Sequence, residues 1–235
     1  MEITWFGERC LRLRGREGTI VADGYRTVVG PTGRGLTADI VTYSHPETPE
    51  SPNMRAATDQ RSGARKENGD GPATVRPTSL EPALLLDRPG EYEAHNVMIT
   101  GVRTFRDESK GIDRGPNVSF VYELDGLHAI HLGDIAHLLT EEMLGEISSV
   151  DVVCVPIGGA LSASRAAELV AQLDANLIVP MPVSREGDGA GEAMDRFLHE
   201  MGVQHPDPQP KLTVTISSIP QETTLVVLDS RSKVS

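Results

Sequence analysis

Two side chains that can bind a metal ion stand where predicted strands end. His45 follows the apolar run 38–43, and Asp134 follows the apolar run 127–132. Imidazole nitrogens and carboxylate oxygens are common ligands of zinc and other divalent ions, and hydrolytic metal sites project such groups from strand ends. The pattern therefore predicts a site built around His45 and Asp134.

Further acidic and histidine side chains stand close by in the sequence. Glu47 and Glu50 follow the histidine and, with Asp134, could form an oxygen-rich site that favours Mg²⁺ or Mn²⁺ over Zn²⁺. His131 and His137 flank Asp134 at a spacing typical of metal ligands. A strand-to-loop segment does not turn such side chains in one direction, so we expect these two histidines to be hydrogen-bonded structural residues.

Three stretches of the chain together resemble the metallo-β-lactamase superfamily. They are the strand that ends in Gly133-Asp134, the segment 40–50, and the motif Arg88-Pro89-Gly90-Glu91-Tyr92 between them. The branch they resemble contains the L-ascorbate-6-phosphate lactonase-like proteins and other metal-dependent hydrolases. The resemblance covers essentially the whole chain, and it implies an α+β fold, the four-layer αββα sandwich.

The same resemblance implies a set of metal ligands, most of which this sequence replaces. In that branch a His-x-His-x-Asp-His segment, together with later His and Asp residues, holds one or two metal ions. His45 and Asp134 fall on two of these positions and keep the expected residue type. The other positions are occupied by Glu47, Pro49, Glu50, Arg106 and Pro182.

The chemistry of these replacements predicts that the two-metal site is lost. Proline has no side-chain donor atom, so Pro49 and Pro182 cannot supply a side-chain ligand. Arginine stays protonated and places a positive charge where a divalent ion would sit. Arg106 could instead pair with Asp134 or Glu47 and fill the vacated position electrostatically.

The elements that must position these residues follow from the hydrophobic pattern. Alternating apolar residues over 1–24, punctuated by glycine, predict short antiparallel strands. Further strands are expected over 83–86, 97–104, 118–124, 127–132, 150–156, 177–181, 212–216 and 223–228, and helices from Thr140, over 162–173 and over 191–201. Antiparallel strands followed by strand–helix alternation indicate layered sheets covered by helices. We expect one domain over 1–235, with 46–80 as a mobile loop or insertion because it has few large apolar side chains.

The amino-acid composition limits the kinds of partner that the protein can bind. The formal net charge is −12 and the pI is about 5.0, so the general surface field repels nucleic acid and anionic lipid. No apolar run approaches the ~20 residues that span a bilayer. Cys10 and Cys154 are the only cysteines, and both stand in apolar runs, which suits buried thiols in a reducing compartment. We therefore expect a cytoplasmic protein without a nucleic-acid or membrane partner.

The sequence leaves three functions open and favours the first of them. In the first, the protein is a degenerate superfamily member without a cofactor and serves as a binding or assembly module whose cleft is filled by Arg106. The second is a hydrolase with a rebuilt mononuclear site, around one Zn, Mn or Mg ion, that acts on a small anionic or lactone substrate. The third is a small-anion binder in which Arg106, His131 and the backbone of Gly158-Gly159 line the cleft. A small anion or a protein is the expected partner, and a homo-oligomer is compatible with all three.

Overall fold

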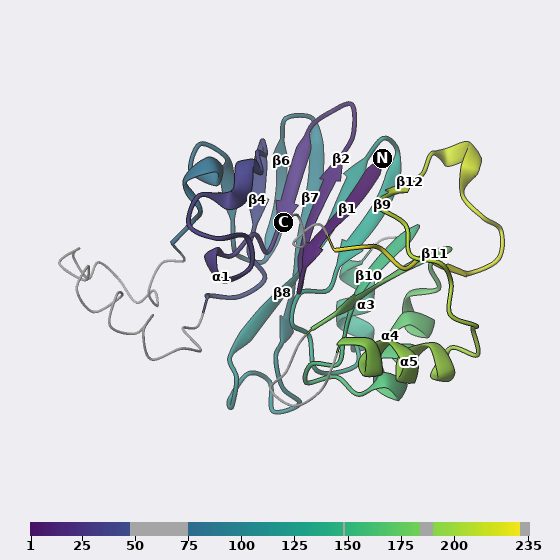
Figure 1. Ribbon diagram of the computed structural model, residues 1–235. Coiled ribbons are helices and arrows are strands. Elements are labelled where there is room, and N and C mark those ends of the chain that lie inside the picture. The colour runs from purple at the N-terminus through teal and green to yellow at the C-terminus, as the bar shows by residue number, and fades with distance from the viewer. Residues whose placement is uncertain (48–74, 148, 184–189, 231–235) are drawn as a thin grey trace.

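Two β-sheets packed face to face form the centre of the molecule (Figure 1). The computed structural model describes residues 1–47, 75–147, 149–183 and 190–230. Within these residues, the first sheet has the strand order β12 (Leu212–Thr213), β1 (Glu2–Gly7), β2 (Cys10–Arg14), β3 (Thr19–Ala22), β4 (Ile40–Thr42) and β5 (Leu84–Leu86). The second sheet has the order β13 (Thr224–Leu225), β11 (Leu177–Pro182), β10 (Val152–Ile157), β9 (Leu127–His131), β8 (Pro116–Leu124), β7 (Val97–Phe105) and β6 (Gly90–Ala94). The loop predicted over 46–80 lies mostly outside the described residues.

Strand direction follows the hydrophobic pattern of each segment. β1, β2 and β3 pair antiparallel, as the alternating N-terminal sequence predicts. β10 and β11 pair parallel and are buried along their whole length. Such continuous apolar strands are typical of parallel pairs that are covered on both faces. The sequence pattern thus separates the antiparallel part of the fold from its parallel part.

Helices cover the outer faces of both sheets. They are α1 (Arg26–Val29), α3 (Glu141–Glu146), α4 (Ala163–Leu173) and α5 (Ala190–Glu200). α3, α4 and α5 share an apolar core with the seven-stranded sheet, and they lie together on one side in Figure 1. None of the helices in the described part of the chain has the length and hydrophobicity that crossing a bilayer requires.

Apolar side chains form three layers that hold the sandwich together. The layer between the sheets contains the fully buried Leu11, Phe120 and Tyr122. A second layer lies under α3, α4 and α5, and a third covers the outer face of the six-stranded sheet beneath α1 and short 3₁₀ turns. The α+β αββα prediction is confirmed, although one outer layer consists of short helical turns rather than long helices.

The helices α3 and α4 each begin after a residue whose hydroxyl caps the helix. Thr140 begins α3, and its hydroxyl accepts a hydrogen bond from the Met143 N–H at 3.3 Å. Ser162 caps α4 in the same way, through the N–H of Arg165. Both caps satisfy a backbone N–H that a helix leaves without an internal partner.

The two C-terminal strands are shorter than predicted. β12 and β13 contain two residues each, whereas the sequence suggested strands over 212–216 and 223–228. After β12 the chain leaves the sheet because Thr215 starts a 3₁₀ turn over Ile216–Ser218, in which its N–H donates to the Ser218 hydroxyl at 2.9 Å. Serine and threonine side chains compete with strand pairing in this way.

Phe197 offers a direct test of how α5 is attached to the sheet. Its side chain is fully buried in the layer under the helices. Phe197→Ala should lower the free energy of unfolding by about 3–5 kcal/mol, because it removes apolar contact and leaves a cavity. Urea unfolding followed by circular dichroism measures the change. Glu200→Ala, at an exposed position of the same helix, is the matched control and should stay within about 0.5 kcal/mol of the wild type. Equal effects of the two substitutions would contradict the packing of α5.

Candidate functional site

The backbone at the end of β9 holds Asp134 in place. Its N–H donates to the side-chain oxygen of Asn117 at 2.9 Å, and the amide nitrogen of Asn117 donates to the Leu132 carbonyl at 2.9 Å. Gly133 has a φ of +66°, and a Cβ added there would lie 2.4 Å from the Cβ of Ser44. Only glycine fits this turn. The Gly-Asp pair visible in the sequence is therefore what places the carboxylate.

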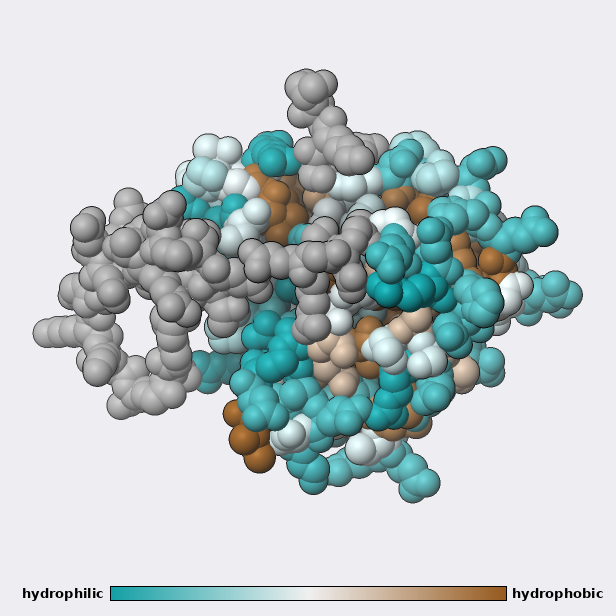
Figure 2. Space-filling model, turned by 60° about the horizontal axis from the view of Figure 1, so that its bottom comes forward, coloured by the Kyte–Doolittle hydropathy of each residue, from teal (hydrophilic) through white to brown (hydrophobic). Residues whose placement is uncertain are grey.

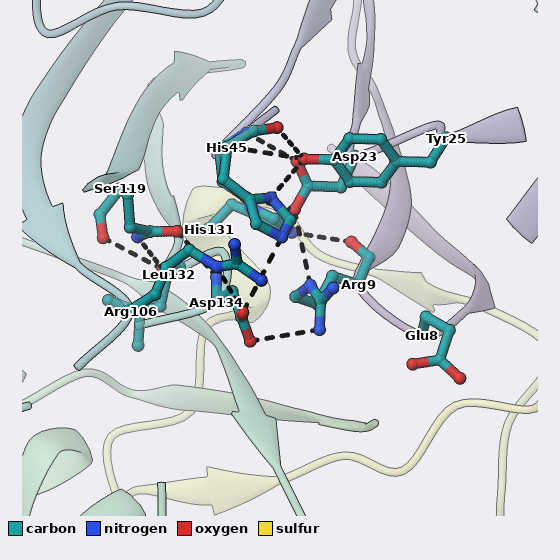
Figure 3. A network of polar contacts seen from close by, with 12 residues as sticks. Glu8, Arg9, Asp23, Tyr25, His45, Arg106, Ser119, His131, Leu132 and Asp134 are labelled. Atoms are coloured by element: carbon teal, nitrogen blue, oxygen red, sulfur yellow. Dashed lines mark hydrogen bonds and ion pairs between the residues drawn. The ribbon is translucent and has the colours of Figure 1, made fainter. Parts of the chain in front are cut away.

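Three guanidinium groups surround this carboxylate, and Figure 3 shows two of them, those of Arg9 and Arg106. Arg106 Nε donates to Oδ2 of Asp134 at 2.8 Å, Arg114 Nη2 donates to Oδ2 at 3.2 Å, and Arg9 Nη1 donates to Oδ1 at 3.3 Å. Burial alone would raise the pKa of Asp134, but the positive charges, that of Arg9 foremost, outweigh it and hold this pKa below its ordinary value. Asp134 is thus an anion whose two oxygens both accept from cationic donors.

His45 lies beside the same carboxylate. Its Nε2 is 3.8 Å from Oδ2 of Asp134, and its Nδ1 is 2.5 Å from the hydroxyl oxygen of Tyr25. Burial lowers the pKa of His45 to about 4, although the nearby carboxylate of Asp23 opposes this shift. The imidazole is therefore neutral near pH 7, and the arginines rather than His45 compensate the charge of Asp134.

The loop between β7 and β8 brings two of the three arginines to the site. The Asp107 carboxylate accepts hydrogen bonds from the N–H groups of Gly111 and Arg114, both at 2.7 Å. Arg106 and Arg114 also donate to each other's carbonyl oxygen, at 3.1 and 3.0 Å. These bonds fix the loop backbone. The third arginine, Arg9, comes from the turn between β1 and β2.

Several residues selected from the sequence do lie together. The predicted pairing of Arg106 with Asp134 is present, with His45 next to it. A Cβ added to Gly159 would lie 4.0 Å from Oδ1 of Asp134, which places this glycine beside the carboxylate. Gly158 has a φ of +78°, and a Cβ there would lie 2.6 Å from a side chain of α5. The Gly158-Gly159 turn therefore borders the site, as the anion-binding hypothesis requires.

The described contacts of Asp134 do not include Glu47 or Pro182. Glu47 accepts hydrogen bonds from the N–H and the hydroxyl of Thr27 in α1, at 2.9 and 2.7 Å, because the chain turns toward α1 after His45. Glu50 lies outside the described residues. Pro182 ends β11. Among the described residues, no three His, Cys, Asp or Glu side chains form a group that could hold a metal ion.

The two histidines that flank Asp134 are hydrogen-bonded to the backbone, as the sequence predicts. His131 is buried between the sheets, where its Nε2 lies 2.8 Å from the Arg9 carbonyl oxygen. It therefore supports the turn that carries Arg9 through a bond to the backbone. His137 accepts from the Phe105 N–H at 3.0 Å through Nε2, and its Nδ1 lies 2.6 Å from the Leu138 carbonyl oxygen. Both ring nitrogens of His137 are thus occupied.

Four residues of the site were missed in the sequence: Arg9, Asp23, Tyr25 and Arg114. Arg9 is separated from Asp134 by 125 residues, and a single arginine in a turn gives no signal of such a contact. Arg114 stands in a polar loop where charged residues are common. The spacing of Asp107 from the glycines after it was the one usable clue, because it indicates a carboxylate-capped turn.

The fold and the strand-end site together define the class of protein. A family model described as a β-lactamase superfamily domain matches residues 2–182. The chain belongs to the metallo-β-lactamase superfamily, as the resemblance in the sequence implied.

Two relatives of this chain carry the name of a metal-dependent hydrolase. A UPF0173 metal-dependent hydrolase from Methanoculleus marisnigri is 26% identical over 188 residues, which are 77% of this chain and 80% of that protein. A protein of the same name from Methanosphaerula palustris is 23% identical over 216 residues, 83% of this chain and 92% of the relative. These names agree with the branch of metal-dependent hydrolases.

Solved structures show the same architecture. A "putative Zn-dependent hydrolase of the metallo-β-lactamase superfamily" from Thermotoga maritima is 27% identical, with a TM-score of 0.69, over 98% of this chain and 99% of that one. A metallo hydrolase from Ignicoccus hospitalis, 15% identical with a TM-score of 0.57 over 91% of this chain and 99% of that one, shares the fold.

Because the imidazole of His45 is buried and uncharged in the folded protein, we expect the protein to lose stability in acid. Folding lowers its pKa from 6.5 to about 4, so between these values the unfolded chain binds a proton that the folded chain does not. The free energy of unfolding should therefore fall as the pH drops from about 6.5 toward 4, with His45 contributing a slope of up to about 1.4 kcal/mol per pH unit. Urea unfolding at several pH values measures this slope. His45→Gln should flatten it, whereas His199→Gln, at an exposed position of α5, should not. An unchanged slope in His45→Gln would contradict the assignment.

Proposed function

We propose that this protein works without a two-metal centre and that the arginine cluster around Asp134 binds a small anion. The observation that carries the proposal is the set of three guanidinium groups on one buried carboxylate. Both oxygens of Asp134 already accept from arginine, and these three bonds leave about one of the four lone pairs of the carboxylate for a metal ion. A guanidinium also carries a positive charge that repels a divalent ion. These contacts do not fit a two-metal centre.

The arginines favour an anion as the ligand. A guanidinium offers a planar set of N–H donors that matches the oxygens of a carboxylate or phosphate. Arg9, Arg106 and Arg114 come from two separate loops and converge on one point, and the Gly158-Gly159 turn borders it. A strongly acidic protein that gathers three cations at one place can attract an anion there, although its net charge is −12.

The surface gives less support to a protein partner at this end of the molecule. Figure 2 shows the end toward which β1 runs, and the described surface there is mostly hydrophilic, with hydrophobic side chains in small separate groups. The large hydrophobic residues with high exposure come from different parts of the chain, namely Val75, Leu84, Met98, Ile112, Val203 and Ile216. Protein-binding surfaces are typically marked by one contiguous apolar patch. A small anion therefore fits better than an assembly partner.

Metal-dependent hydrolysis is the second candidate, and the names of the relatives favour it. It would require His45 and Asp134 to hold one divalent ion after the arginines leave the carboxylate. Such an ion would lower the pKa of a bound water or polarise a substrate oxygen. The substrate class would then be a small anion or a lactone.

Metal content separates the two candidates. Tag-free protein should contain less than about 0.1 equivalent of Zn, Mn, Fe or Ni by plasma mass spectrometry, even after incubation with each metal. About one equivalent, lost on His45→Ala, would refute the metal-free proposal and support the hydrolase. Arg106→His combined with Pro182→His should raise the affinity for metal, because it restores two imidazoles at the positions that the family resemblance implies. No gain would show that the strand ends no longer hold the ligand geometry.

Anion binding has its own test. Inorganic phosphate and small carboxylates should stabilise the protein in thermal unfolding, by about 2.7 kcal/mol at a concentration 100-fold above Kd. Arg106→Ala and Arg114→Ala should abolish this stabilisation. Arg103→Ala is the charge-matched control, since Arg103 is exposed on the same strand that leads to Arg106, and it should leave the effect intact. Equal losses in all three variants would indicate a general charge effect and contradict a specific site.

A further inference from the structure

We infer that the β7–β8 loop, residues 106–115, is a hinged arm that swings away from Asp134 when an anion binds its arginines. The inference rests on the proposed function and deepens it by naming what controls access to the site. Asp134, His45 and Arg106 are 4%, 7% and 8% exposed, so the closed conformation shields them from a ligand in solution. Because Arg106 and Arg114 both belong to the loop, moving it opens the site and exposes their donors together.

Bonds within the loop make it a unit of its own. The Asp107 carboxylate accepts from the N–H groups of Gly111 and Arg114, both at 2.7 Å. The N–H of Arg106 donates to the Gly115 carbonyl at 3.2 Å, and the N–H of Gly115 donates to the Gly111 carbonyl at 3.0 Å. These bonds tie the two ends of the loop to its middle. A segment braced in this way opens as one cooperative body.

Apolar packing does not fasten this loop to the sheets. None of residues 106–115, all of which the structure describes, belongs to the three apolar layers, and within the loop only Arg106 is buried. Ile112, the one large apolar side chain of the loop, is 83% exposed. Segments with few buried apolar contacts open at a lower free energy than the core. The loop can therefore leave without disturbing the sandwich.

Ion pairs hold the loop in its closed position. Arg106 and Arg114 contact Oδ2 of Asp134, and Glu108 pairs with Arg165 of α4. The Glu108 and Arg165 side chains are 66% and 40% exposed, so water and salt weaken this outer ion pair. Arg114 is 32% exposed at its side chain, and an anion that binds there competes with Asp134 for the same N–H donors.

The two ends of the loop suit a hinge. At the β7 end, the Phe105 N–H donates to Nε2 of His137 at 3.0 Å, and the Phe105 carbonyl accepts from the Ala136 N–H at 3.1 Å. These bonds fix the strand end. At the other end, Gly115 has a φ of +90°, and no described atom lies within 4 Å of a Cβ added there. The backbone of Gly115 is therefore free to change its dihedral angles.

Arg9 keeps the carboxylate compensated when the loop is away. It comes from the turn between β1 and β2, and its Nη1 donates to Oδ1 of Asp134 at 3.3 Å. Movement of the β7–β8 loop leaves this contact in place and admits water to Oδ2. The open state thus does not leave an isolated buried charge, which would be costly.

Spin labels can report the position of the loop in the whole chain. Ile112→Cys places a label at the loop tip, and Ala171→Cys places one at an exposed position of α4. Cys10 and Cys154 are buried and stay unlabelled. Pulsed electron–electron double resonance should give one distance between the labels without anion. Inorganic phosphate should add a second, longer distance, and sodium chloride at the same ionic strength should add less of it.

Two substitutions at α4 test the outer ion pair. In the doubly labelled protein, Glu108→Gln should raise the population of the longer distance by about two- to fivefold, the change expected from an exposed ion pair. Glu168→Gln is the matched control, because Glu168 is another exposed acid near Arg165, at 4.0 Å, but belongs to α4 itself. It should leave the population unchanged. Equal effects of the two substitutions would refute the role of Glu108.

The outcomes separate this inference from the proposed function. A distance that phosphate leaves unchanged, while phosphate still stabilises the protein in thermal unfolding, would overturn the hinged arm and leave anion binding standing. An equal response to phosphate and to chloride would also overturn it, because screening and not a bound anion would then move the loop. An unchanged distance without any stabilisation by phosphate would overturn both.

Discussion

A buried carboxylate must be compensated, and this constraint organises the loop end of the molecule. Asp134 is almost fully buried, and an isolated charge there would be costly. Its compensation comes from the β1–β2 turn, which supplies Arg9, and from the β7–β8 loop, which supplies Arg106 and Arg114. Asp134, which follows a strand of the seven-stranded sheet, thereby fixes by ion pairs a turn of the six-stranded sheet and a loop of its own sheet.

Guanidinium groups and divalent ions satisfy a carboxylate in different ways, and the difference bears on function. A divalent ion draws several ligands to one point and can activate a water molecule. Guanidiniums hold strand ends with directed N–H donors and offer the remaining donors to anions. In the proposed site the superfamily scaffold keeps a carboxylate at the strand end, and guanidinium groups take the place of a divalent ion beside it. His45, neutral near pH 7 and hydrogen-bonded to Tyr25, lies beside the carboxylate without adding a positive charge of its own.

Much of the fold could be predicted because its elements are encoded locally. Alternating residues gave the antiparallel strands β1–β3, continuous apolar runs gave β10 and β11, and Thr140 and Ser162 marked helix starts. The superfamily resemblance ordered these elements into layers. The end of β12 was placed wrongly, because the Ser218 hydroxyl accepts the Thr215 N–H and starts a turn there. The end of β13 was also placed wrongly.

The sequence by itself determined which residue types reach the strand ends, including His45, Asp134 and the arginine at position 106. Only the tertiary structure decided which of them meet. It joined Arg9 to Asp134 across 125 residues, added Arg114 through the turn organised by Asp107, and sent Glu47 to Thr27. The physical reason is that periodicity and capping report the local surroundings of a residue. Charge pairing instead depends on which loops the packed sheets bring together, and that is set by the core as a whole.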